Sequence, residues 1–122
     1  MGKLEGKVAV ITGGTSGIGL ATAQEFVNNG AKVVVFGRNQ ENIDAAVKQL
    51  GSNSLGIKGD ITNQGDLDNL FSETKSKFGG IDTLFINVGK GKLAPVADTD
   101  EAFFDDMMDV NFKGSYLSLI HI

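Results

Sequence analysis

The sequence has no cysteine or tryptophan and only one proline, one tyrosine, one histidine and one arginine in 122 residues. Without cysteine the chain forms no disulfide and carries no thiolate chemistry, which is typical of a reducing compartment, and we expect a cytoplasmic protein. No apolar run approaches the ~20 residues that cross a bilayer, and the first five residues lack the apolar core of a signal peptide. We therefore expect no membrane partner.

Positive charge is also scarce. Lysine and arginine together number 11 against 15 acidic residues, so the formal charge is −4, and Arg38 is the only arginine. The lysines are scattered and form no basic stripe that could neutralise a nucleic-acid backbone, so we expect no nucleic-acid partner. We also expect no metal site. An apolar content of 41% and this length suit one folded domain.

A glycine-rich stretch near the N-terminus organises the rest of the chain. Residues 8–11 are apolar and mostly β-branched, which predicts a buried strand, and apolar residues then recur at helical spacing up to Asn28. A strand, a glycine turn and a helix in this order form a phosphate-binding unit, because backbone N–H groups at a helix N-terminus hold anions. We expect a nucleotide pyrophosphate to contact Gly13, Thr15, Ser16, Gly17, Ile18 and Gly19.

Strands and helices continue to alternate along the chain. Further strands are predicted at 32–36, 55–59 and 83–86, and helices at 40–50, capped by Asn39, and 67–78, closed by Gly79 and Gly80. Short connections and right-handed crossovers then require a parallel sheet. The prediction is an α/β, Rossmann-type three-layer sandwich with strand order 3-2-1-4, truncated after the fourth strand and the helices that follow.

A further helix is predicted beyond the fourth strand. Asp98 and Glu101 have the spacing of a capping box. An apolar face follows, which we interpret as core packing, and it consists of Phe103, Phe104, Met107, Met108 and Val110.

The end of the second strand indicates which cofactor is bound. An acidic residue there would bind the ribose 2′-hydroxyl of NAD, but the sequence has Gly37 at that position and Arg38 next to it. Because a guanidinium suits a 2′-phosphate, we expect NADP(H) to be favoured over NAD(H).

Four ordered motifs together resemble the short-chain dehydrogenase/reductase family. Residues 12–19 resemble its TGxxxGIG signature, and the segment around Asp60 resembles its aspartate after the third strand. Residues 87–89 resemble the end of its NNAG motif, with Ile86 and Val88 departing from it, and residues 110–114 resemble the segment with its catalytic asparagine.

The resemblance implies reversible hydride transfer between the nicotinamide and a small carbonyl or alcohol substrate, in a protein that is a homo-oligomer. It makes Asn111 a catalytic residue that organises a proton-relay water. It also adds cofactor contacts, with Asp60 on the adenine and the others at Ile61, Asn87, Val88, Gly89 and Val110.

Part of the family's catalytic set does not map onto these residues. The family pairs a serine with Tyr-x-x-x-Lys, whereas Tyr116 is followed four residues later by Ile120. We interpret residues 1–116 as the N-terminal part of an NAD(P)-binding domain that is inactive alone. Residues 117–122 spell a translated transposon mosaic end used in sequencing libraries, which indicates a non-native tail.

Two other functions remain open. One is a non-catalytic dinucleotide-binding sensor, which would lack the Tyr-x-x-x-Lys motif. The other is a nucleotide-sugar epimerase, whose usual GxxGxxG turn differs from the Gly-x-x-x-Gly-x-Gly spacing found here.

Overall fold

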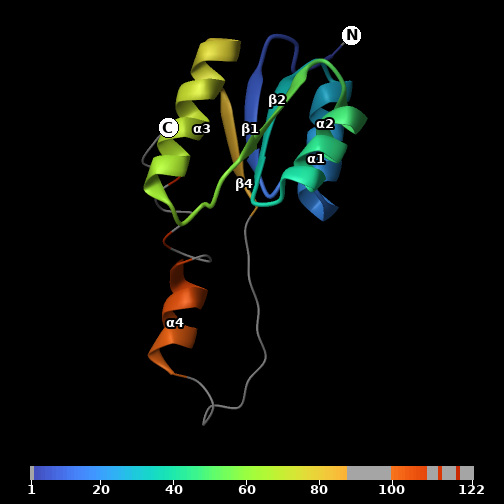
Figure 1. The fold of residues 1–122 in the computed structure, drawn as a ribbon. Helices are drawn as coiled ribbons and strands as arrows, with labels where there is room; N and C mark the ends of the chain where they lie inside the picture. The colour runs from blue at the N-terminus through green and yellow to red at the C-terminus, as the bar shows by residue number, and fades with distance from the viewer. Residues whose placement is uncertain (1, 88–99, 110–112, 114–117, 119–122) are drawn as a thin grey trace.

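Strands and helices alternate along the chain in the computed structural model, which describes residues 2–87, 100–109, 113 and 118 (Figure 1). The strands are parallel in the order β3-β2-β1-β4, which confirms the predicted sheet. The elements are β1 (Val8–Thr12), α1 (Gly17–Asn28), β2 (Lys32–Gly37), α2 (Gln40–Leu50), β3 (Ser54–Lys58), α3 (Gln64–Phe78), β4 (Thr83–Ile86) and α4 (Glu101–Met108).

The sheet is the middle of three layers. Helices α1 and α2 cover one face and α3 covers the other (Figure 1). Successive residues of β2 alternate between the two cores, because side chains along a strand point to opposite faces. Val33 and Val35 join the core beneath α1 and α2, whereas Val34 and Phe36 join the core beneath α3. The central strands are therefore continuously apolar.

Local signals set the ends of the middle helices. The Asn39 side chain accepts from the Asn42 N–H at 3.0 Å and begins α2, as predicted. Asn63 does the same for α3 by accepting from the Asp66 N–H at 2.9 Å. Gly79 has a φ of 87° and ends α3, because a residue without Cβ adopts this left-handed conformation easily.

An aspartate at the amino end of β4 fixes how this strand pairs with β1. The Val8 N–H donates to Asp82 Oδ2 at 2.9 Å, and the Asp82 N–H donates to the Val8 carbonyl at 2.8 Å. The resulting register places Thr12 beside Ile86 at the carboxyl end. The residues that follow, Gly13 and Asn87, are consequently neighbours.

The fourth helix differs from the prediction at its start. Asp100, not Asp98, is its N-cap, because the Asp100 carboxylate accepts from the Phe103 N–H at 2.8 Å; Asp98 lies outside the described residues. The predicted capping box would have used the Glu101 N–H, three residues after Asp98, whereas the observed cap uses the Phe103 N–H, three residues after Asp100.

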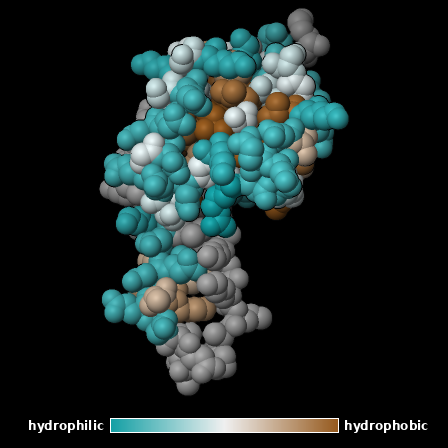
Figure 2. Space-filling view, in the orientation of Figure 1, coloured by the Kyte–Doolittle hydropathy of each residue, from teal (hydrophilic) through white to brown (hydrophobic). Residues whose placement is uncertain are grey.

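The expected core packing of this helix is also wrong for the described residues. No residue of α4 is buried, and Phe104 and Met108 are 61% and 41% exposed. The helix lies beyond the carboxyl ends of the strands, away from both helical layers, so neither layer covers its apolar face (Figure 1). Figure 2 shows hydrophilic side chains over much of the visible surface of the sheet layers, with apolar patches among them, and a few apolar side chains beside hydrophilic ones on α4. Val110 lies outside the described residues.

A membrane-spanning helix and a metal site are both absent from the described residues. Within the described ranges, no helix combines the length and apolar character needed to cross a bilayer. The same residues contain no group of three or more His, Cys, Asp or Glu side chains placed to hold a metal ion.

The exposed edge of the sheet leads to a prediction about the 122-residue chain by itself. Strand β4 is the last strand on its side of the described sheet, and Phe104 and Met108 on α4 are exposed. Since unpaired edges and apolar faces promote association, we expect the isolated chain to self-associate. Light scattering after size-exclusion chromatography should find species above 12.8 kDa. A monomer with one sharp thermal transition would contradict this.

Candidate nucleotide-binding site

The candidate site lies where the strand order of the sheet reverses, next to β1. The chain passes from β1 to β2 on one side, whereas β4 lies on the other side of β1. In open parallel sheets, ligands bind outside the carboxyl ends of the strands at such a switch point. The glycine turn after β1 and Asn87 after β4 both lie there.

Close backbone contacts require glycine at two positions of this turn. Gly13 has a φ of 66°, and a Cβ there would overlap the Asn87 carbonyl oxygen. A Cβ on Gly19 would overlap the Gly13 carbonyl oxygen and lie 2.7 Å from Asn87 Nδ2. The first turn of α1 therefore packs directly on the turn that precedes it.

Asn87 joins the two strand ends by hydrogen bonds. Its side-chain Nδ2 donates to the Gly13 carbonyl at 3.4 Å, and its backbone N–H donates to Thr12 Oγ1 at 3.0 Å. The buried Thr12 hydroxyl donates in turn to the Phe85 carbonyl at 3.4 Å. The structure thus brings together Gly13, Gly19 and Asn87, which the sequence separates by up to 74 residues.

The N-terminus of α1 fits an anionic ligand. Ser16 is its N-cap residue but makes no side-chain capping hydrogen bond, whereas Asn39, Asn63 and Asp100 each cap their helices. The first N–H groups of a helix have no intrahelical acceptor, so a ligand oxygen is a suitable partner. Gly17, with a φ of 56°, has open space where its Cβ would lie, and Ile18 is 73% exposed.

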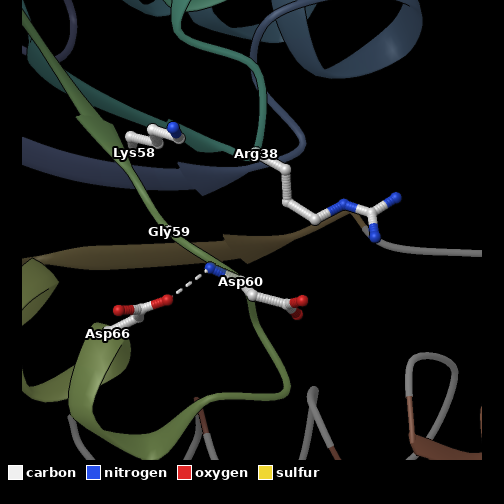
Figure 3. Close-up of a pocket in the computed structure, with 5 residues that line it drawn as sticks. All are labelled: Arg38, Lys58, Gly59, Asp60 and Asp66. Atoms are coloured by element: carbon white, nitrogen blue, oxygen red, sulfur yellow. Dashed lines mark hydrogen bonds between the residues drawn. The ribbon is translucent and has the colours of Figure 1, made fainter.

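Arg38 lies on the other side of the glycine turn from Asn87. It follows Gly37, whose missing Cβ would lie 3.3 Å from Thr15 Cγ2. This contact places the end of β2 against the turn. Arg38 is exposed and lines an open pocket of about 250 Å³ together with residues from the end of β3, the β3–α3 connection and the first turn of α3 (Figure 3).

Asp60 is held in place by its neighbours. Its Oδ1 accepts from the Thr62 N–H at 2.9 Å and from the Thr62 hydroxyl at 2.7 Å. Its own N–H donates to Asp66 Oδ2 at 2.8 Å, the bond drawn in Figure 3. The Ile61 side chain is buried in the core beneath α3, which leaves its backbone for any contact with a ligand.

Some residues expected in the site lie outside the described part of the chain: Val88, Gly89, Val110 and Asn111. Others were not predicted. Thr12 joins β1 to β4, Asp66 holds the Asp60 backbone, and Lys58 lines the pocket with Arg38. The Asn63-x-x-Asp66 spacing was a possible signal for Asp66, because a capping box has an acceptor at its N3 position.

Comparison with known proteins identifies the family. The family described as short chain dehydrogenase matches residues 7–120. The chain belongs to the short-chain dehydrogenase family. This short-chain dehydrogenase chain is 40% identical over 117 residues to oxidoreductase asL5 of Sarocladium schorii, covering 96% of this chain and 47% of that protein. It is 37% identical over 123 residues to tropinone reductase-like 1 of Erythroxylum coca, covering 98% and 45%.

A solved structure shows the same fold. The 3-ketoacyl-(acyl-carrier-protein) reductase of Brucella melitensis, complexed with NADH, matches with a TM-score of 0.92 and 33% identity, covering 98% of this chain and 50% of that one. The chain thus spans about half the length of the curated relatives it matches. The Rossmann-type fold and the family agree with the expectations from sequence.

The packing of Gly19 leads to a prediction about stability. Alanine normally favours a helix over glycine by about 1 kcal/mol, but here the added Cβ meets backbone oxygen. We expect Gly19→Ala to lower the free energy of unfolding of the full-length protein by about 2 kcal/mol, as measured by urea denaturation. Gly80→Ala is the control, because nothing lies within 4 Å of its Cβ. Equal effects of the two changes would contradict the packing role.

Proposed function

We propose that the protein is an NADP(H)-preferring oxidoreductase that transfers hydride reversibly between the cofactor and a small carbonyl or alcohol substrate. The preference is supported by one observation above all. The strand end that faces the glycine turn carries Gly37, with no carboxylate, and Arg38 follows it. A carboxylate there would repel a 2′-phosphate, whereas a guanidinium pairs with one.

The same chain offers contacts for the rest of the dinucleotide. In this proposal the uncapped first turn of α1, from Ser16 to Gly19, holds the pyrophosphate, with Gly13 and Thr15 beside it. The Asp60 carboxylate and the Ile61 backbone lie at the adenine end, and Asn87 lies at the nicotinamide-ribose end with Val88, Gly89 and Val110. The exposed Ile18 side chain then covers part of the bound cofactor.

The chemistry divides between cofactor and protein. A bound nicotinamide supplies or accepts the hydride. In this proposal Asn111 is the catalytic residue of the chain and orders a water for proton transfer. In this proposal the protein works in the cytoplasm, which the absence of cysteine favours, and forms a homo-oligomer, as the resemblance to the family implies.

Arg38→Ala tests the cofactor preference. Loss of a charge-assisted phosphate contact should weaken NADPH binding by about 10- to 100-fold in the full-length protein, while NADH binding changes little. Titration of cofactor fluorescence measures both affinities.

A reciprocal variant is available for this test. Gly37→Asp should move the preference toward NADH, because its carboxylate repels a 2′-phosphate. The added Cβ would lie 3.3 Å from Thr15 Cγ2, so it needs only a small shift of that side chain. An unchanged NADPH/NADH affinity ratio in Arg38→Ala would rule out the role proposed for the arginine.

A second candidate function is a non-catalytic dinucleotide-binding regulator. Residues 1–122 contain one tyrosine, and no lysine follows it at the spacing that the family uses. Cofactor binding and turnover are therefore separate questions, and one assay series answers both.

We expect the 122-residue chain alone to show no turnover, and the full-length protein to oxidise NADPH in the presence of a carbonyl substrate. The reason is that a proton donor matched to the hydride step is needed for turnover. Absorbance of NADPH across a panel of aldehydes and ketones measures the rates. Binding without turnover in the full-length protein would favour the regulator, and turnover by the short chain would contradict the proposed inactivity.

A further inference from the structure

Lys58 is an exposed cation at the candidate site that the proposed function does not use. It is the last residue of β3, and its Cα pairs with that of Gly37 at the end of β2. The Gly59 N–H donates to the Gly37 carbonyl at 2.8 Å, so the pairing continues past Lys58. Lys58 therefore lies one strand spacing, about 4.8 Å, from Gly37, the position at which this type of fold contacts the ribose.

The two side-chain positions share one face of the sheet. Val33 and Val35 lie beneath α1 and α2, so by alternation Gly37 faces the same side, where its Cβ would approach Thr15 and Ile43. On β3, a Cβ at Gly56 would meet Ile43 of α2. Lys58 is two residues further along and so faces that side as well. Its flexible four-carbon stem can bring the ammonium over Gly37.

The charges around Lys58 favour an anion. Lys58 and Arg38 line one pocket with Gly59, Asp60 and Asp66 (Figure 3). Both carboxylates accept hydrogen bonds inside the protein, Asp66 from the Asp60 N–H and Asp60 from Thr62. With the residues that the structure describes, neither Arg38 nor Lys58 makes an ion pair or a side-chain hydrogen bond. The two cations are thus available to a ligand.

We propose that Lys58 is a second specificity-determining residue, which pairs with the 2′-phosphate of NADP(H) from the β3 side while Arg38 pairs with it from the β2 side. The inference rests on the proposed function, since it needs a cofactor with a 2′-phosphate. A phosphate monoester carries about two negative charges at neutral pH, so two cations match it better than one. Gly37 leaves the space between them.

Lys58→Met tests this inference, because methionine keeps an unbranched stem without the charge. In the full-length protein we expect NADPH affinity to fall about fivefold and NADH affinity to stay within about twofold. Lys58→Arg should retain the preference. The NADPH/NADH affinity ratio should also depend less on salt in Lys58→Met than in the unaltered protein, because one screened charge pair is gone.

Lys7→Met is the matched control, since Lys7 is an exposed lysine at the opposite, amino end of the sheet and its replacement should leave the ratio unchanged.

The inference is overturned if Lys58→Met leaves the NADPH/NADH affinity ratio unchanged or lowers the affinity for both cofactors equally. If Arg38→Ala still alters the ratio in that case, the NADP(H) preference stands without Lys58. If the unaltered protein binds both cofactors equally, the preference itself fails. NADH binding shows whether each variant is folded. If the Lys58→Met protein does not fold, Lys58→Gln is used in its place.

Discussion

The close approach of three backbone segments at the carboxyl end of β1 is the constraint on which the rest of the structure depends. Gly13 and Gly19 have no space for a Cβ, because the Asn87 and Gly13 carbonyl oxygens occupy it. This contact sets the first turn of α1 against the sheet and joins β4 to β1. At the opposite end of the same strand pair, Asp82 bonds both the N–H and the carbonyl of Val8. The candidate site is therefore built on a strand pair that is fixed at both ends.

The hydrogen-bonding groups around the site leave N–H groups and cations available to an anionic ligand. Three helices begin with a side chain that accepts from a first-turn N–H, and α1, which faces the site, does not. In a chain with a formal charge of −4, Asp60 and Asp66 direct their carboxylates to donors of the protein itself. Arg38 and Lys58 thereby supply the local positive charge, whose effect is short-ranged in salt.

Much of the fold followed from local sequence patterns. Alternating runs and caps predicted β4 at 83–86 and α2 at 40–50 with the structure's own bounds, and β1, β2 and β3 to within one residue at each end. The strand order followed from the Rossmann-type pattern that the glycine turn indicates, because the fixed hand of the crossovers does not by itself set the order. The start of α4 was wrong, because two aspartates stood near it and only the folded backbone selects which carboxylate reaches the Phe103 N–H.

The sequence by itself determined the elements and the glycine turn, because each depends on residues within a few positions of one another. The parallel sheet followed from the alternation of these elements and their short connections. The sequence also determined the family, through the order of its motifs. Tertiary structure alone decided that Asn87 contacts Gly13, that Lys58 lies beside Gly37, and that apolar side chains of α4 are exposed. These depend on strand register and on what covers a helix, and no local pattern encodes contacts between residues that are distant along the chain.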